Sequence, residues 1–276
     1  PEGSFLMGSP DGEGGQDEHP QRRLNLSAFW IGETEVTFEQ AARFLNDKGN
    51  QVEGGVTWVN MGAADFQIEQ IGDLYRAKKG FERHPVEGIT WFGARALAQW
   101  MGGDLPTEAQ WEKAAKGGRS VRYPWGDEWS PRMAATAERI AGVREFKAYQ
   151  DWLTWWEPFQ KKTLVEQADY SDTTVPVKTY TPNGYGLYDL AGNVWEWCLD
   201  WYAADQYGRW RDGMSNPVNE EGGDMQAVEY WQGGEKKSER QACRVVRGGG
   251  WDYLAAVTRC ANRGRVRPAG RSSGGG

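Results

Sequence analysis

The sequence predicts an α+β fold in which helices come early, short strands come late, and the sheet is mixed or antiparallel. Segments with helical spacing and helix-start signals cluster in the first half, whereas the later apolar segments are short and aromatic. Helices and strands do not alternate as they do in a parallel βαβ fold. The 37 Gly and 16 Trp residues indicate many turns around an aromatic core, which excludes a helical bundle.

The chain opens with two predicted strands. Residues 5–7 form a short apolar run, which an acidic, Gly-rich loop follows. Leu24, Leu26 and Trp30 then alternate with polar residues, as one face of a second strand would.

Three predicted helices follow, each starting at a threonine. Thr37 and Thr107 each precede a Gln at the third following position, which is the capping-box pattern, and apolar residues then recur at helical spacing. Thr90 opens the second helix, which Gly102 ends, and Gly117 ends the third.

The second half of the chain is less regular. The Trp-rich segment 148–162 fits either one amphipathic helix or an irregular insertion. A turn at residues 183–184 leads into a buried aromatic strand region, and residues 243–247 predict one more strand. The loosened pattern around the Trp-rich segment predicts an insertion near 140–172, and a polar, irregular stretch predicts another near 203–241.

Composition excludes several classes of function. The net charge of −7, with acidic and basic residues interspersed, argues against nucleic acid as a ligand. No apolar segment is long enough for a membrane span, and no signal stretch is visible, although the chain begins with Pro and the compartment stays open. Without an internal repeat or linker, the simplest organisation is a single domain spanning 1–276.

The metal-binding and redox residues are few. Cys198, Cys243 and Cys260 have the spacing of neither a disulfide framework nor a metal-binding pair. His19 and His84 are the only histidines, so a metal centre with several histidine ligands is excluded for this chain. No cofactor is required by these residues.

Several long stretches together resemble one family. They read PEGSFLMGSPDGEGGQDEHPQRRLNLSAFWIGETEVT, HPVEGITWFGARALAQWMGGDLPTEAQWEKAAKGG, YPWGD, NGYGLYDLAGNVWEW and VVRGGGW. This is the order seen in formylglycine-generating-enzyme (sulfatase-modifying-factor) domains, and it covers nearly the whole chain apart from the two insertions. The resemblance implies a C-type-lectin-like fold, elaborated as in that family. Because this fold carries enzymes and pure binding proteins alike, it does not by itself give a function.

The resemblance argues against catalysis by this chain. Oxygen-dependent enzymes of the family carry a cysteine pair between a Gly-rich turn and an R-x-A-x-R motif, where the thiolates bind copper and attack the substrate. The matching interval here, residues 252–258, contains no Cys, and Cys260 lies beyond it within RCANR. A small buried apolar side chain is the expected role of Cys260. A copper- and oxygen-dependent formylglycine-generating oxidoreductase is therefore the disfavoured alternative.

The resemblance also implies a calcium site. Some family members bind Ca²⁺ at the stretch that matches Gly192 to Glu196, through side-chain oxygens equivalent to those of Asn193 and Glu196 and through backbone carbonyls. Alternatively, Asn193 and Glu196 are buried polar residues that backbone or Arg partners satisfy. The residues leave both interpretations open.

The closing segment, residues 251–276, is most similar to a branch of the same fold, the variable proteins of diversity-generating retroelements. In that branch, adenines of a template are copied unfaithfully into the last part of the gene. An AAC codon can then become any codon ending in C, and such codons never encode Lys, Glu, Gln, Trp or Met. The residues between the fixed points of the segment all belong to the set that can be reached in this way.

The resemblance thus predicts a non-catalytic, ligand-binding protein with a diversified surface. Its partner would be a protein or another macromolecule. The predicted variable positions are Asp252, Tyr253, Leu254, Ala255, Ala256, Val257, Thr258, Gly264, Arg265, Val266, Arg267, Ala269, Gly270, Ser272 and Ser273. Tyr253 is the expected central contact, with Asp252, Arg265 and Arg267 setting charge complementarity. A non-diversified lectin-like module, or a plain surface loop rich in Gly, Ala, Ser and Arg, is the alternative.

The fixed points between the variable positions are expected to hold the backbone. These anchor residues are Trp251, Arg259, Ala261, Arg263, Pro268 and Arg271. If they fix the main chain by packing and hydrogen bonding, the intervening side chains can change without altering its conformation.

Overall fold

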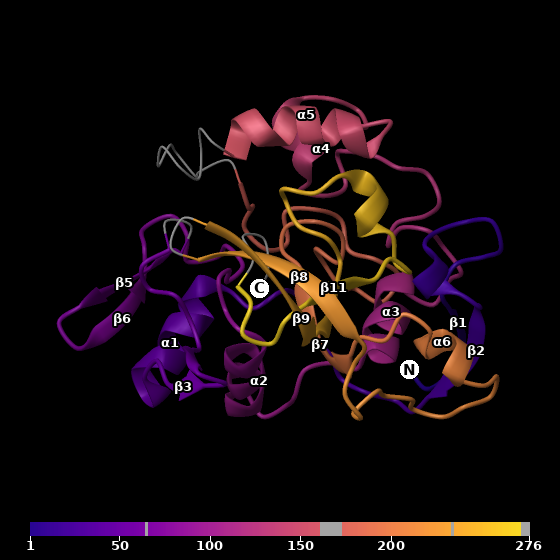
Figure 1. Ribbon diagram of the computed structural model, residues 1–276, viewed down its shortest axis with the longest axis horizontal. Helices are drawn as coiled ribbons and strands as arrows, with labels where there is room; N and C mark the ends of the chain where they lie inside the picture. The colour runs from indigo at the N-terminus through magenta and orange to yellow at the C-terminus, as the bar shows by residue number, and fades with distance from the viewer. Residues whose placement is uncertain (64–65, 161–172, 233–234, 272–276) are drawn as a thin grey trace.

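The computed structural model describes residues 1–63, 66–160, 173–232 and 235–271 (Figure 1). Its helices are α1 (Phe38–Lys48), α2 (Trp91–Trp100), α3 (Glu108–Lys116), α4 (Ala137–Ala141), α5 (Tyr149–Gln160) and α6 (Gln206–Arg209), with 3-10 turns η1 (Gln16–Glu18) and η3 (Ala255–Thr258). Its strands are β1 (Gly3–Met7), β2 (Arg22–Leu26), β3 (Val52–Glu53), β4 (Val56–Thr57), β5 (Ile68–Ile71), β6 (Leu74–Ala77), β7 (Glu196–Trp201), β8 (Met225–Gln232), β9 (Glu235–Ala242), β10 (Arg244–Arg247) and β11 (Gly264–Val266).

The predicted helix starts are confirmed. The hydroxyls of Thr37, Thr90 and Thr107 each accept a hydrogen bond from the backbone amide three residues later, which satisfies one of the unpaired donors of the first turn. Helix α3 ends at Gly117, whose φ of 57° is left-handed and favours glycine.

The central sheet is small and antiparallel. Strand β10 lies between β7 and β11, and the residue pairs include Val246 with Trp197 on one side and with Gly264 on the other. The other strands pair as two-stranded antiparallel units, namely β1–β2, β3–β4, β5–β6 and β8–β9. With these helices, the arrangement confirms the predicted α+β class.

Three packed layers position the C-terminal segment. Helix α3 packs behind the sheet, where Trp111, Cys198 and Val245 share one apolar cluster. Helices α1 and α2 form a second cluster to one side with β5 and β6, and α4 and α5 lie on the opposite side of the segment from α3 (Figure 1). The closing segment is thus enclosed by elements from distant parts of the chain.

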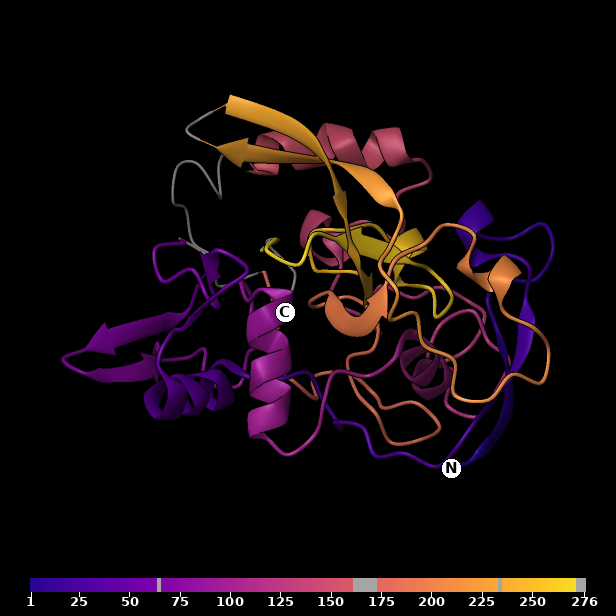
Figure 2. The ribbon, with the colours of Figure 1, turned by 60° about the horizontal axis from the view of Figure 1, so that its bottom comes forward.

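Two sequence-based expectations are corrected by the structure. The stretch 203–241 is not wholly irregular, because it contains α6 and most of the long β8–β9 hairpin, which extends from the body of the molecule (Figure 2). Trp30 does not belong to the second strand, since β2 ends at Leu26 and the Trp30 side chain is fully exposed.

The Trp-rich segment is a helix rather than an irregular insertion. Helix α5 ends at Gln160, and residues 161–172 of the predicted insertion lie outside the described part of the chain. One face of the helix is buried through Trp152 and Trp156, whereas Thr154 and Glu157 on the opposite face are exposed. The helix is therefore amphipathic, as one of the two interpretations expected.

Candidate functional site

Two arginines of the closing segment are fixed by buried carboxylates. Arg259 donates from Nη1 and Nη2 to the two oxygens of Glu18, at 2.8 and 2.7 Å. Arg263 donates from Nε and Nη2 to the two oxygens of Glu108, at 2.7 and 3.0 Å. Bidentate pairs of this kind fix orientation as well as position. Burial opposes ionisation of Glu18, but the guanidinium of Arg259 lowers the pKa of that carboxyl to about 2.

The remaining anchor residues hold the two ends of the described segment. The indole Nε1 of Trp251 donates to Oε1 of Glu87 at 2.8 Å. The backbone carbonyl of Pro268 accepts from the first amide of α2 at 3.0 Å, and Arg271 donates to the backbone carbonyl and hydroxyl of Thr57. These contacts agree with the anchoring role expected of Trp251, Pro268 and Arg271.

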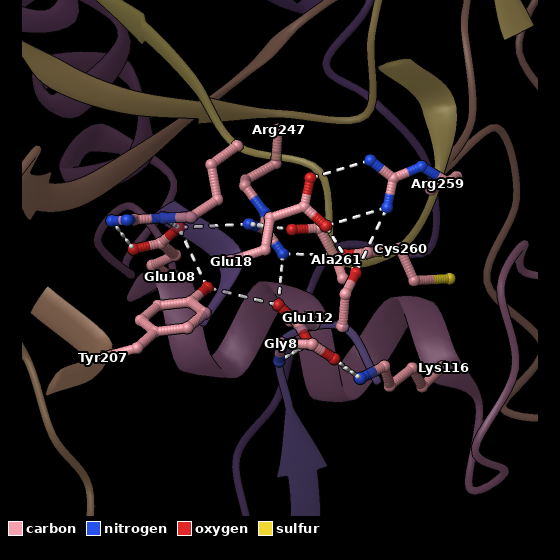
Figure 3. A network of polar contacts seen from close by, with 12 residues as sticks. Gly8, Glu18, Glu108, Glu112, Lys116, Tyr207, Arg247, Arg259, Cys260 and Ala261 are labelled. Atoms are coloured by element: carbon pink, nitrogen blue, oxygen red, sulfur yellow. Dashed lines mark hydrogen bonds and ion pairs between the residues drawn. The ribbon is translucent and has the colours of Figure 1, made fainter. Parts of the chain in front are cut away.

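A buried ion network lies behind the segment (Figure 3). Arg247 donates from Nη1 to Glu108 at 3.0 Å and from Nη2 to Glu112 at 2.5 Å, and Lys116 donates to Glu112 at 2.7 Å. Although burial favours the neutral acid, the charges of Lys116 and Arg247 hold the pKa of Glu112 below its usual value. Arg247 also donates to the backbone carbonyl of Cys260, so the network reaches the segment directly.

Glycines let the segment approach the strand that precedes it. Gly248 and Gly249 have φ of 90° and 80°, a region that side chains rarely adopt. A Cβ at Gly249 would come within 2.8 Å of the Thr258 side chain. This contact accounts for the Gly-rich turn of the VVRGGGW stretch.

Helix α5 covers the first part of the segment. The ring of Trp152 stacks on Tyr253, with 5.6 Å between centroids, and its Nε1 donates to the backbone carbonyl of Asp252 at 2.8 Å. Trp156 meets Trp251 edge to face at 6.0 Å. Leu254 joins the same apolar cluster. The segment between Trp251 and Leu254 is thus packed from both sides.

The predicted variable positions divide into two groups. Buried are Asp252, Leu254, Ala255, Thr258 and Gly270. Exposed or partly exposed are Tyr253, Ala256, Val257, Gly264, Arg265, Val266, Arg267 and Ala269. Ser272 and Ser273 lie outside the described residues. The expectation that all of these side chains face outward is therefore wrong for the buried group, because α5 and the loop's own packing cover them.

The exposed and partly exposed positions come from two stretches, 253–257 and 264–269, that meet at Trp195. Tyr253 contacts Trp195 edge to face at 5.3 Å, and Val257 and Val266 pack against the same apolar cluster. Arg265 is exposed, with its guanidinium 5.0 Å from the centre of a Tyr202 ring. We call the positions 256, 257, 265, 267 and 269 the accessible positions.

The predicted calcium residues occupy different surroundings. Asn193, with a left-handed φ of 64°, donates from Nδ2 to Glu35 at 2.7 Å, and its Oδ1 accepts from the amide of Val175 at 2.9 Å. Glu196 is partly exposed, and burial raises its pKa to about 7. Among the described residues, no group of three acidic, His or Cys side chains is placed to hold a metal ion. Calcium at Asn193 and Glu196 stays a prediction, and Asn193 has the backbone partner that the alternative expected.

All three cysteines are buried free thiols. Burial raises the pKa of Cys198 well above its usual value, raises that of Cys243, and raises that of Cys260 to about 12. Such thiols are protonated near neutral pH and are poor nucleophiles.

The acidic residues that pair with the anchor residues and with Arg247 were not predicted. Glu18, Glu87, Glu108 and Glu112 are all buried. A signal exists for two of them, since Glu108 and Glu112 are one helical turn apart on either side of the apolar Trp111.

In the described residues, no helix is long and apolar enough to cross a bilayer.

The chain is similar to a known family model and to several known sequences. The model of the sulfatase-modifying factor enzyme 1-like domain matches residues 1–276. The formylglycine-generating enzyme of Streptomyces coelicolor is 32% identical over 99% of this chain and 82% of its own. The serine/threonine-protein kinase pkn1 of Chlamydia caviae is 33% identical over 98% of this chain, which spans 35% of that relative's length. The bovine inactive C-alpha-formylglycine-generating enzyme 2 is 30% identical over 75% of this chain and 71% of its own.

Two solved structures share the fold. PvdO from Pseudomonas aeruginosa aligns with a TM-score of 0.63 at 22% identity, covering 98% of this chain and 88% of its own. Treponema denticola variable protein 1 aligns with a TM-score of 0.58 at 22% identity, covering 100% of this chain and 90% of its own. These likenesses bear out the C-type-lectin-like architecture, elaborated as in the formylglycine-generating type.

Proposed function

Because this chain belongs to the family of sulfatase-modifying factor enzyme 1-like domains, we propose that it is a non-catalytic binding domain whose C-terminal surface is diversified by a retroelement. One observation carries this proposal. The anchor residues Arg259 and Arg263 are locked by Glu18 and Glu108, while the accessible positions before and after them are exposed or partly exposed. A fixed main chain with replaceable side chains suits recognition of changing targets.

The absence of catalysis is supported by the state of the thiols. Cysteine chemistry of the formylglycine-generating type needs accessible thiolates, whereas Cys198, Cys243 and Cys260 are buried with raised pKa values. The interval 252–258 offers no other thiol. The family contains a relative named inactive as well as relatives named as enzymes, so membership alone does not require activity.

The proposed ligand is a protein or another macromolecule. Arg265 places positive charge on the accessible surface, which also includes Ala256 and Val257, whereas the guanidinium of Arg267 lies 3.6 Å from Glu239. Arginine is favoured at binding hot spots, and a neighbouring apolar residue adds contact area. The fold shared with Treponema denticola variable protein 1 supports this proposal at the level of architecture.

The names of the relatives favour one rival, a copper- and oxygen-dependent formylglycine-generating oxidoreductase. The purified chain, loaded with Cu⁺, would be incubated with a cysteine-containing sulfatase peptide in air, and aldehyde would be measured by mass spectrometry. The proposal predicts no aldehyde above a sample without protein. Catalytic turnover would overturn the non-catalytic assignment.

Diversification itself is tested in the neighbouring DNA. The proposal predicts a reverse transcriptase gene and a near-copy of the 3′ segment with adenines at codons for the variable positions. A conventional gene neighbourhood without either would leave a non-diversified lectin-like module as the better description.

Calcium binding at Asn193 and Glu196 forms a separate proposal from the family resemblance. Unfolding curves in millimolar CaCl₂ and in EGTA would show a higher midpoint with calcium if the ion binds the folded state. Superimposable curves would contradict a calcium site at this stretch.

A further inference from the structure

Arg244 begins β10 at the point where this strand meets the closing segment. It pairs with Val266 of β11 on one side and with Trp201 of β7 on the other. Trp91, the first residue of α2, donates its backbone amide to the carbonyl of Pro268 at 3.0 Å. Arg244 and Trp91 therefore lie beside the predicted variable stretch 264–270.

The guanidinium of Arg244 lies between two indoles. Its Cζ is 3.8 Å from the centre of a Trp91 ring and 3.6 Å from the centre of a Trp201 ring. Both faces of the guanidinium are thus covered, which fixes its plane. Burial lowers the pKa of Arg244 to about 10, so the side chain is still a cation at neutral pH.

One edge of this guanidinium has no hydrogen-bond partner in the described part of the chain. Nη1 donates to the backbone carbonyl of Leu199 at 2.6 Å, whereas Nε is buried without a partner and Nη2 is unpartnered but not buried. Nε and Nη2 are the two donors with which Arg263 holds the oxygens of Glu108. The free edge of Arg244 therefore carries the donor pair that binds a carboxylate elsewhere in this chain.

The acidic residues near Arg244 have other partners. Among the described residues, no carboxylate forms an ion pair with Arg244. Asp200 raises the pKa of Arg244, but its oxygens accept from two backbone amides at 2.7 and 2.8 Å. Asp104 pairs with the neighbouring Arg95 at 3.0 Å. The partly exposed Arg244 is thus left with one positive charge that has no anionic partner.

We propose that Arg244 is a constant anchor beside the diversified surface, and that its free edge binds a carboxylate of a protein ligand. One positive charge matches the single negative charge of a carboxylate, and the two indoles keep water from the faces of the guanidinium. Because Arg244 precedes the segment 251–276, diversification would leave it unchanged. This inference rests on the proposed function, since it names the partner chemistry of that surface.

The test uses three blocked tripeptides: acetyl-Gly-Glu-Gly-amide, acetyl-Gly-Gln-Gly-amide, and acetyl-Gly-Gly-Gly with a free C-terminal carboxylate. Each is titrated into the ¹⁵N-labelled full chain at constant ionic strength, and the Arg244 Nε–H signal is followed by NMR spectroscopy. The Glu peptide is expected to bind at least about tenfold more tightly than the Gln peptide, because only its side chain is charged.

The same titrations can contradict the proposal. Equal affinities for the Glu and Gln peptides, or no saturable shift with either carboxylate peptide below about 0.1 M, would overturn it. Tighter binding of the third peptide than of the Glu peptide would assign the carboxylate to the C-terminus of a protein ligand rather than to an acidic side chain.

Two variants and one control assign the binding to Arg244. Arg244→Lys keeps the charge but loses the planar pair of donors, and should weaken the Glu peptide about tenfold. Trp201→Leu removes one covering ring and should weaken it as well. Arg43→Gln removes an exposed guanidinium that pairs with Glu39 and should leave the affinity unchanged. Binding is followed through whichever of the Arg244 Nε–H and Trp201 indole N–H signals remains.

These variants also separate this inference from the proposed function. Unchanged affinity in folded Arg244→Lys and Trp201→Leu would show that the peptide binds elsewhere, while the expected template in the neighbouring DNA would be unaffected. A conventional gene neighbourhood would remove diversification but leave binding of the Glu peptide at Arg244 intact.

Discussion

At the residue scale, the main chain of the closing segment is held by buried ion pairs between residues that are far apart in sequence. Arg263 and Glu108 are 155 positions apart, and both side chains are at most 1% exposed. Removing Arg263 leaves the buried Glu108 with Arg247 but without its bidentate partner, which costs more than loss of an exposed pair. Single substitutions at these buried residues should therefore destabilise the fold, whereas substitutions at exposed positions of the segment should be tolerated.

We expect Arg263→Met to lower the free energy of unfolding by about 3 kcal/mol, because Glu108 loses its bidentate partner in the core. The matched control is Arg95→Met, whose guanidinium pairs with Asp104 at the surface with 38% and 36% of the side chains exposed. That loss should stay below about 1 kcal/mol. Urea denaturation measures both values, and equal losses would contradict the role given to the buried pair.

The pair between Glu18 and Arg259 makes stability depend on pH. The folded pKa of Glu18 is about 2, below the ordinary 4.5, so its contribution is present above pH 4.5 and is lost as pH falls towards 2. The wild type should therefore lose about 2 kcal/mol more than Glu18→Gln between about pH 6 and about pH 3.

The control for this pH effect is Glu39→Gln, in which an exposed carboxylate paired with Arg43 is removed. It should follow the wild-type curve, because an exposed pair contributes little. Parallel pH curves for the wild type and Glu18→Gln would show that Arg259 does not stabilise the ionised carboxyl.

At the element scale, α5 decides which part of the closing segment is surface. Its Trp152 and Trp156 pack on Tyr253 and Trp251, so the first stretch of the segment belongs to the core. Sequence could not give this result, because the helix comes from a segment about a hundred residues earlier and its docking is a tertiary contact. The capped helices, by contrast, were predictable since Thr37 and Thr107 act within their own first turn.

Trp152→Ala should lower the free energy of unfolding by about 3 kcal/mol, through loss of a buried ring and of its hydrogen bond to Asp252. Thr154→Ala, on the exposed face of the same helix, should change the free energy of unfolding by less than about 1 kcal/mol. Chemical denaturation of the two variants checks this. If Trp152→Ala is as mild as Thr154→Ala, α5 does not cover the segment in solution.

Other elements escaped prediction for a different reason. The β5–β6 hairpin has the short strands Ile68–Ile71 and Leu74–Ala77, and most of their side chains face solvent, so no alternating apolar pattern marks them. The β8–β9 hairpin is similarly polar in its second strand, Glu235–Ala242, which resembles an irregular insertion. Strands without a buried face carry little sequence signal.

At the scale of the whole molecule, the sequence located the candidate surface but did not show which of its predicted positions are buried. The anchor residues were identifiable as fixed points, and their hydrogen bonds agree with that role. The acidic partners of Arg259 and Arg263 lie in η1 and α3, far from the segment in sequence, where single carboxylates resemble ordinary surface residues. Long-range charge pairing is a property of the folded chain and leaves little local pattern.

The central claim is that a rigid frame carries replaceable positions. It is tested by displaying the domain on yeast with one codon at a time replaced by every codon ending in C. Folded variants are sorted by thermal challenge and counted by sequencing. We expect nearly all substitutions to survive at Ala256 and Arg265, few at the buried Leu254 and Thr258, and almost none at Arg263. Equal tolerance at Arg263 and Arg265, or intolerance at Ala256 and Arg265, would contradict the account.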